Sequence, residues 1–340
     1  MSTKRFLIGT YEESMGIWEL TLDMKCRQVL SSRCLSNTRR NSYLALRHGI
    51  CYAVSEIPLA EGPAGSLHSF HVTETGLEPV DRLDHLPPLL AHLNLNQAGT
   101  TLYTASYGTG EILALEIKNG KFGHILSSTQ SVGSSVNPLR QTCAHPHGLW
   151  LSRDEKHLFL SDLGTDEVLS WPLEPKGRLV LQEKRSFSIP AGYGPRHMTF
   201  DPDENRAYLV TEMAYHILEF AVYGGELTLL RDISLENDIP RNEQGGGAIR
   251  LSSNGRWLFA SNRSVNHSRI DVLSTDYMTR VVTLTECLFP RDFILSRDEE
   301  FLICGNQKEN SVSIFRQSNR NWNHFWTVNN IPTPACIIEL

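Results

Sequence analysis

Short apolar segments alternate with polar turns along the whole chain, and one arrangement of them returns six times. Each copy has an apolar segment of strand length, a turn containing Asp, Asn or Gly, and a second apolar segment that ends in a polar residue. Two such segments in succession indicate a pair of antiparallel strands. The copies begin at Asn41, His92, His147, His197, Gly247 and Arg291.

The spacing of these copies predicts the architecture. Further alternating segments, such as EILALEIKN and HILEFAVYG, supply a third strand, and a weaker fourth precedes the next copy. The second segments end at Glu56, Tyr107, Asp162, Glu212, Asn262 and Asn306, with a partial match at Thr10, so they recur every 44 to 55 residues. This is the period of a propeller blade. We therefore predict an all-β protein, a seven-bladed β-propeller with four antiparallel strands per blade.

The two ends of the chain complement each other. The opening segment RFLIGTYE has no inner strand before it, and the final segment PTPACIIEL is a lone strand. We predict that the N- and C-terminal strands pair within one blade, which closes the ring and leaves no open sheet edge. Residues 1–340 then form a single domain. The alternative, two β-sandwich domains, does not require a repeating sequence.

Composition narrows the class of protein. Apolar residues make up 40% of the chain and charged residues 21%, which is typical of a soluble globular protein. No apolar run reaches membrane-spanning length, and the N-terminus lacks a secretory pattern, so we expect a cytoplasmic protein. Seven cysteines without a C-x-x-C pair suggest reduced thiols. The net charge of −6, without a basic run, argues against nucleic acid and membrane partners.

The register of the repeat also predicts a site. The innermost strand of a blade and its neighbour are antiparallel, so the start of the first and the end of the second lie at one end of the central channel. Side chains there differ from blade to blade yet stay polar or charged, which is typical of a binding surface. Arg196 and Arg263 adjoin the same rim. We expect substrate to be bound by His92, His197, Arg291, Tyr107, Asp162, Glu56, Asn306 and Gln307.

Several motifs resemble one known family. They are the opening FLIGTY, HPHGLWLSRDEKHLFLSDLGTDEV, GPRHMTFDPDENRAYLVTE, LSSNGRWLFASNR and FPRDFILSRDEEFLICGNQ. Together they resemble the lactonase family of seven-bladed propellers, which includes bacterial 6-phosphogluconolactonases and fungal carboxymuconate cyclases. The active-site residues proposed for the cyclases fall by motif on His147, Arg196, Glu212 and Arg263. One departure is Ala248, where relatives often carry an acidic residue.

The resemblance and the residue types together predict lactone chemistry. Hydrolysis needs an activated water, a stabilised oxyanion and a proton for the leaving alkoxide. His147 and Glu212 are suited to the acid and base roles, and Arg196 and Arg263 to stabilising negative charge. We expect a metal-independent hydrolase without a cofactor, acting on a small anionic lactone of the sugar or sugar-phosphate type, as a monomer or weak homo-oligomer.

Other functions use the same features. A carboxy-cis,cis-muconate cyclase would clamp the carboxylates of a polycarboxylate substrate with the arginines and close a lactone ring. A non-catalytic propeller would bind a protein or metabolite, for which Trp322 and Trp326 are the clustered aromatic candidates, although packing on the last blade is the expected role of both.

Metal binding and a lid are further hypotheses. His145 and His147 alone are a weak zinc pattern, and His145 is expected to be structural. A ring of oxygen donors suited to calcium would comprise Glu56, Asp162, Glu212, Asn262 and Asn306, but the neighbouring arginines argue against a cation. The polar, glycine-rich segment 238–247 is placed to act as a lid over the mouth.

Overall fold

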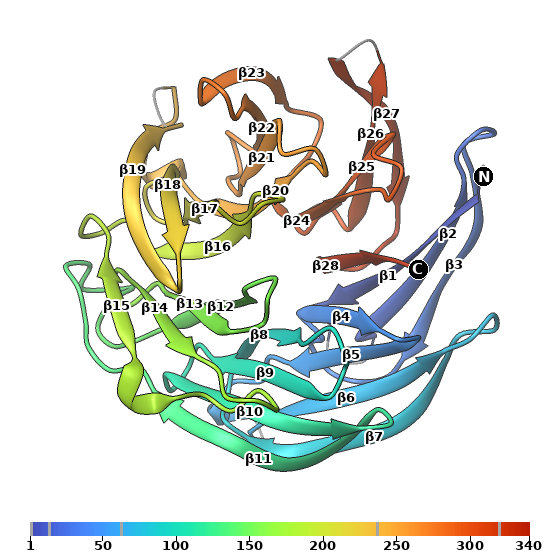
Figure 1. Ribbon diagram of the computed structural model, residues 1–340. Coiled ribbons are helices and arrows are strands. Elements are labelled where there is room, and N and C mark those ends of the chain that lie inside the picture. Colours follow the sequence, from blue (N-terminus) through green and yellow to red (C-terminus); the bar gives the residue numbers. More distant parts are fainter. Residues whose placement is uncertain (1–2, 13–14, 62–63, 236–237, 319–320) are drawn as a thin grey trace.

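In the computed structural model, seven four-stranded antiparallel sheets are arranged as blades around a central axis (Figure 1). The structure describes residues 3–12, 15–61, 64–235, 238–318 and 321–340. The predicted seven-bladed β-propeller is therefore confirmed. Within the described ranges, no helix is long and apolar enough to span a membrane.

We number the blades from the one that holds both chain ends. Blade 1 contains β28 (Pro334–Glu339), β1 (Thr3–Thr10), β2 (Ile17–Asp23) and β3 (Gln28–Ser36). Blade 2 contains β4 (Tyr43–Arg47), β5 (Ile50–Ser55), β6 (Gly65–Val72) and β7 (Leu77–Leu86). Blade 3 contains β8 (Leu90–Leu95), β9 (Thr101–Ser106), β10 (Glu111–Lys118) and β11 (Lys121–Gln130). Blade 4 contains β12 (Pro146–Leu151), β13 (His157–Asp162), β14 (Glu167–Pro172) and β15 (Arg185–Ser188).

The remaining three blades have the same order of strands from the channel outward. Blade 5 contains β16 (Pro195–Phe200), β17 (Arg206–Thr211), β18 (His216–Tyr223) and β19 (Glu226–Ser234). Blade 6 contains β20 (Gly246–Leu251), β21 (Trp257–Asn262), β22 (Arg269–Ser274) and β23 (Thr279–Leu284). Blade 7 contains β24 (Pro290–Leu295), β25 (Phe301–Asn306), β26 (Ser311–Ser318) and β27 (Asn321–Asn329). In the described part of the chain, three short 3-10 turns, η1 (Leu59–Glu61), η2 (Leu181–Glu183) and η3 (Arg241–Glu243), lie in loops.

The ring closes as the two chain ends predicted. β28 pairs with β1 in antiparallel fashion, with Ile337 opposite Ile8, and it occupies the inner position of blade 1. Both ends of the chain therefore lie in the same blade, as Figure 1 shows. The pairing gives the first blade the inner strand that its own segment of sequence lacks.

The recurrent Ser-x-Asx segment builds the tight turn between the first two strands of several blades. In blade 4, Ser152 Oγ donates to Asp154 at 2.7 Å and accepts from the backbone N–H of His157 at 3.0 Å. The same pair of bonds is made by Ser252 and by Ser296. These serines are nearly buried, so their bonds fix the length of the turn and with it the register of the two inner strands.

The core lies between neighbouring blades, because both faces of each sheet are covered by the sheets beside it. The middle strand β17 reads Arg-Ala-Tyr-Leu-Val-Thr, and all but its first residue are buried. Val210, Ile217, Ile249 and Leu258 belong to one cluster that joins blades 5 and 6. Trp322 belongs to another cluster in blades 6 and 7, edge-on to Phe259 at 5.5 Å, so its expected packing role is confirmed.

Candidate functional site

A β-bulge at the start of the inner strand brings three charged or polar side chains to the channel mouth. In blade 4, Pro146 pairs with Asp162 and Gly148 with Ser161, which leaves His147 as the additional, unpaired residue. The same shift leaves Arg196 unpaired in blade 5 and Arg291 in blade 7. A bulge re-aims a side chain that the regular pleat would direct elsewhere. The bulges therefore explain why these side chains face the mouth rather than the interfaces between blades.

The second strand contributes to the mouth through the residue that follows its last paired position. The last positions are polar and almost completely buried: Thr10, Ser55, Ser106, Asp162, Thr211, Asn262 and Asn306. The residues that follow them and supply the mouth are Tyr11, Glu56, Tyr107, Glu212 and Arg263. Gln307 takes the same position after Asn306, and its buried Oε1 has no hydrogen-bond partner among the described residues. Because neighbouring positions of a strand face opposite ways, this difference of one residue separates two structural roles.

This register corrects the expected roles of Asp162 and Asn306. Asp162 is fully buried and accepts hydrogen bonds from Ser131 Oγ and from three backbone N–H groups, including that of His145 at 2.7 Å. Asn306, also fully buried, donates to Ser311 and Ser313 and accepts from the N–H of Leu288. Both side chains hold loops together, so their polar atoms are already satisfied by the protein rather than directed at a ligand.

Glu212 is the centre of the mouth and collects three guanidinium groups. Its Oε1 accepts from Arg140 Nη2 at 2.6 Å, and its Oε2 lies 3.0 Å from Arg196 Nε and 2.5 Å from Arg263 Nη2. His147 Nε2 lies 3.8 Å from the same Oε2, too far for a hydrogen bond but within reach of its charge. The four residues that the resemblance implied, Glu212, Arg196, Arg263 and His147, are thus brought together.

Burial and charge fix the protonation states of this cluster. Burial alone raises the pKa of Glu212, but Arg263 and Arg196 outweigh it and hold that pKa well below its usual range. Burial, and then the charge of Arg196, lowers the pKa of His147 well below its usual range. At neutral pH, Glu212 is therefore ionised and His147 is a neutral imidazole. His147 Nδ1 is buried and makes no hydrogen bond within the described structure.

A second charged group completes the mouth. Tyr11 donates to Glu56 and accepts from Arg291, whose Nη2 also lies 4.0 Å from Glu56 Oε2. Arg291 is close enough to lower the pKa of Arg196, after burial and Arg263. The four mouth arginines, Arg140, Arg196, Arg263 and Arg291, face two carboxylates, Glu56 and Glu212, so this part of the mouth carries an excess of two positive charges.

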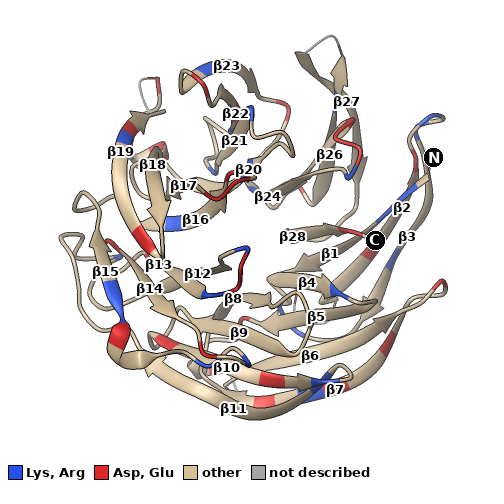
Figure 2. Ribbon diagram, in the orientation of Figure 1, with Lys and Arg blue, Asp and Glu red and all other residues tan. Residues whose placement is uncertain are grey.

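That local excess contrasts with the chain as a whole. The protein has a net charge of −6, and Figure 2 shows acidic and basic segments interspersed over the blades. A positive site flanked by low-dielectric protein concentrates anions near it. The mouth is therefore suited to a small anionic ligand.

His92 and His197 lie beneath the mouth rather than on its rim, which corrects their expected position. Their ring centres are 5.7 Å apart, and Tyr43 and Trp150 pack against His92 at 3.9 and 5.3 Å. Both imidazoles are nearly buried, and burial lowers the pKa of each, that of His92 to about 3. Together these four rings separate the mouth from a cavity of about 620 Å³ at the other end of the channel, which Tyr43 and Trp150 also line.

Two residues of the mouth were missed by the sequence reasoning. Arg140 lies in the loop between β11 and β12, where the Asn137 side chain accepts from the backbone N–H of Arg140 at 3.1 Å. The available signal was the spacing from Tyr107 to Asp162, which is the longest in the chain and marks an insertion. Tyr11 follows the partial repeat at Thr10 and ends the FLIGTY motif, but neither signal assigned it to the mouth.

The glycine-rich segment supports the arginines directly. Gly247 O accepts from Arg196 at 2.8 Å, and Gly246 O accepts from Arg263 at 3.0 Å. A Cβ on Gly246 would lie 2.1 Å from the carbonyl oxygen of Thr211, so only glycine permits this approach. Upstream, Glu243 is bonded to Ser264 and Asn266. Closure of this segment as a lid remains a prediction.

The structure also bears on the metal hypotheses. Among the described residues, no group of three or more His, Cys, Asp or Glu side chains is arranged to hold a metal ion. The oxygen donors suggested for calcium do not form one ring, because Asp162, Asn262 and Asn306 cap loops while Glu56 and Glu212 face the mouth.

His145 packs beside the mouth. Its ring stacks on that of Tyr107 at 4.3 Å, and its Nδ1 lies 2.7 Å from the backbone carbonyl oxygen of Tyr107. These contacts are consistent with the expected structural role of His145.

Fold and mouth together define a seven-bladed propeller with a positively charged site at one end of its channel. Residues 5–338 match the family described as lactonase, 7-bladed beta-propeller. The chain therefore belongs to this family, which confirms the resemblance seen in the sequence motifs. The expectation of a lactonase-type enzyme agrees with this membership.

Ala248 stands where relatives in this family often carry an acidic residue. It is fully buried in an apolar cluster, so this member has no carboxylate at position 248.

Individual relatives align along nearly the whole chain. A 6-phosphogluconolactonase of Bacillus subtilis is 25% identical over 326 residues, covering 91% of this chain and 90% of the relative. The uncharacterised protein YwcC of Lactococcus lactis is 27% identical over 320 residues, covering 92% of both chains. The crystal structure of the periplasmic gluconolactonase of Pseudomonas aeruginosa superposes with a TM-score of 0.90 at 24% identity, covering 100% of this chain and 99% of that one, which supports the fold.

Proposed function

We propose that the protein hydrolyses a small anionic lactone at the channel mouth, without a metal ion. The observation that carries the proposal is the cluster itself: an ionised carboxylate and a neutral imidazole, 3.8 Å apart, beneath an excess of guanidinium groups. The curated relatives include proteins named 6-phosphogluconolactonase. A sugar-phosphate lactone carries an anionic group that matches the excess positive charge of the mouth.

His147 is the residue that moves protons in this proposal. As a neutral imidazole it accepts a proton from water while the water oxygen bonds to the lactone carbonyl carbon. Arg196 and Arg263 stabilise the resulting oxyanion. When the ring C–O bond breaks, His147 returns the proton to the leaving alkoxide, so the net change is addition of one water. Glu212 is a weak base because of its low pKa. Its role is to stabilise the protonated imidazole and to hold the two arginines in place.

Arg140 and Arg291 are the groups proposed to hold the anionic substituent. Arg140 has a side chain that is 45% exposed, so it is accessible from the open side of the mouth. Arg291 belongs to the second charged group of the mouth, together with Tyr11 and Glu56. The ring system of His92, His197, Tyr43 and Trp150 closes the channel below and limits access of bulk water to the reacting atoms.

The test is a lactone panel measured by acid release, corrected for spontaneous opening. It compares 6-phosphoglucono-lactone, unphosphorylated gluconolactone and a neutral aliphatic lactone. We expect the phosphorylated compound to give the highest kcat/KM, and His147→Gln to lower kcat about 10² to 10⁴-fold. Glu219→Gln is the matched control, because Glu219 is a buried, arginine-paired carboxylate on β18, outside the mouth. No lactone opened by the purified protein, or an unaffected His147→Gln variant, refutes the proposal.

The cyclase reaction would use the same arginines for a polycarboxylate substrate. The named relatives from Bacillus subtilis and Pseudomonas aeruginosa bear lactonase names rather than a cyclase name, and we favour hydrolysis for that reason. Incubation with a carboxymuconate, followed by ultraviolet absorbance, separates the two reactions, because ring closure removes the conjugated diene.

A further inference from the structure

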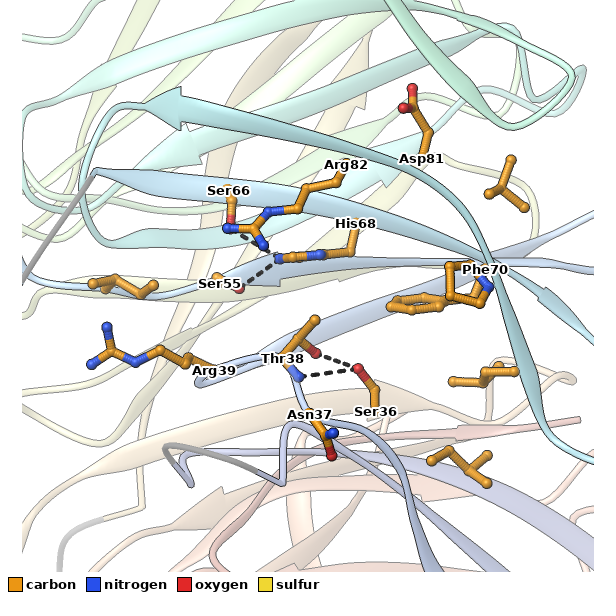
Figure 3. Close-up of a pocket in the computed structure, with 15 residues that line it drawn as sticks. Ser36, Asn37, Thr38, Arg39, Ser55, Ser66, His68, Phe70, Asp81 and Arg82 are labelled. Atoms are coloured by element: carbon orange, nitrogen blue, oxygen red, sulfur yellow. Dashed lines mark hydrogen bonds between the residues drawn. The ribbon is translucent and has the colours of Figure 1, made fainter.

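A second cavity lies between blades 1 and 2 and is lined by different residues from those of the mouth (Figure 3). Its volume is about 690 Å³, within the range of small-molecule sites. The walls come from the end of β3 and the segment after it, and from β5, β6 and β7. Leu35, Phe70 and Leu77 supply apolar wall, while Ser55, Ser66 and His68 form a polar group among the strands of blade 2, as Figure 3 shows.

The position of His68 has an equivalent in every blade. His68 pairs with Ala53, two residues before the end of the second strand of blade 2. The corresponding position of the third strand is leucine in blades 3, 4 and 5, where Leu113, Leu169 and Leu218 are buried against the preceding blade. The same position is Trp18 in blade 1, Asp271 in blade 6 and Ser313 in blade 7, so it is not apolar in every blade. In blade 2 it places a buried histidine beside two serines at the wall of the cavity.

The hydrogen bonds of His68 leave donor capacity for a ligand. Ser55 Oγ lies 3.1 Å and Ser66 Oγ 2.9 Å from the same ring nitrogen, Nε2. Burial, and then the charge of Arg82, lowers the pKa of His68 to about 4, so the ring is neutral at neutral pH. A neutral ring nitrogen makes one good hydrogen bond as donor or acceptor. At least one serine hydroxyl hydrogen therefore remains available for another acceptor.

One guanidinium group beside the cavity, that of Arg82, keeps donors for an anionic head group. Arg39, Arg82 and Asp81 line the cavity, and Arg39 Nη2 already lies 3.8 Å from Glu61 Oε2. Asp81 Oδ2 accepts from the backbone N–H of Phe122 at 2.8 Å, so part of its accepting capacity is used within the protein. Arg82 uses Nε for Asp84 at 2.8 Å, which leaves its two Nη groups for a second acceptor.

We propose that this cavity is a second binding site, which accepts a monocarboxylate with an apolar body of one or two rings. The carboxylate is held by Arg82 and a serine hydroxyl beside His68, and the body packs against Leu35, Phe70 and Leu77. Most of the surface of the cavity is apolar, while nine of its fifteen lining residues bring polar or charged groups, and a small-molecule site usually combines the two. The site is independent of the function proposed for the mouth.

The test uses naphthalene-2-carboxylate as the probe and naphthalene-2-methanol as its neutral counterpart, both measured by isothermal titration calorimetry. We expect saturable binding of the carboxylate and at least tenfold weaker binding of the alcohol. His68→Leu replaces the imidazole by the residue that three other blades carry, so the variant is expected to fold, and binding should fall at least tenfold because the polar group is lost. Arg82→Gln, at a largely exposed side chain, should weaken binding several-fold.

A control separates this site from the mouth, whose arginines also attract carboxylates. Arg263→Met removes a mouth charge and should leave the affinity of the probe unchanged. Density for the naphthyl ring between β3 and β7 in a soaked crystal would support the assignment. No saturable binding to the wild-type protein, equal binding to wild type and His68→Leu, or density at the mouth alone would overturn it.

Discussion

Replacing Glu212 by Gln tests whether the mouth is held together by one buried carboxylate. The change preserves size but removes the negative charge that Arg196 and Arg263 share at 3.0 and 2.5 Å. The side chains of these arginines are 2% and 9% exposed, so water cannot replace the lost partner. Leaving a buried charge without its partner costs about 3 to 5 kcal/mol of folding free energy. Arg140 adds little, because its side chain is nearly half exposed.

The stability difference should also depend on pH. The native pKa of Glu212 lies below its unfolded value, so its stabilising contribution is complete above about pH 4.5, the ordinary range of a glutamic acid. It is lost as the pH falls through the native pKa. The gap between wild type and variant should therefore be widest at neutral pH and close progressively in acid.

The assay is urea unfolding of both proteins between pH 7 and pH 3, together with lactone hydrolysis at neutral pH. We expect the variant to lose activity by about 10²-fold or more, because the arginines and the imidazole lose their common partner. Glu219→Gln controls for loss of a buried carboxylate elsewhere, and it should retain activity. Equal urea midpoints for wild type and Glu212→Gln at neutral pH, together with unchanged activity, would refute this account of the mouth.

Three further outcomes follow from the same structure. Arg140→Gln should raise KM for an anionic lactone about tenfold. The Tm should change little, since the side chain of Arg140 in its pair with Glu212 is nearly half exposed. A KM equal to that of the wild type would exclude Arg140 from substrate binding. Asp162→Ala should lower the unfolding free energy by about 3 kcal/mol, because four hydrogen bonds lose their acceptor. The kcat per folded molecule should stay within about twofold of the wild type. A large fall in kcat at unchanged stability would show instead that Asp162 acts in the mouth. Exhaustive dialysis against EDTA should leave hydrolysis unchanged, and activity lost on dialysis but restored by Ca²⁺ would show that a metal participates.

The repeat in the sequence predicted the architecture because each blade buries both faces against its neighbours. That requirement imposes an apolar strand, a tight turn and a second apolar strand on every blade. The unit can therefore be recognised in the amino-acid sequence alone. The closure of the ring was predictable for a related reason, since RFLIGTYE and PTPACIIEL each lack the partner that the other provides.

The mouth was predictable only where a motif identified the residue directly. His147, Arg196, Glu212 and Arg263 were found in this way and lie together. Asp162 and Asn306 were placed one position away from their actual role, because a shift of one residue along a strand reverses the direction of a side chain. Polar character alone does not distinguish a residue that caps a loop from one that faces a ligand.

The sequence by itself determined the number of blades, the pairing of the chain ends and the identity of four mouth residues, because these depend on periodicity and motif. Only the tertiary structure decided which polar side chains face the channel, since the bulges at His147, Arg196 and Arg291 are not encoded in the apolar pattern. It also decided the charge balance of the mouth. Arg140, from a loop outside the repeat, reaches Glu212 through space, and contacts between distant segments leave no periodic signal in the chain.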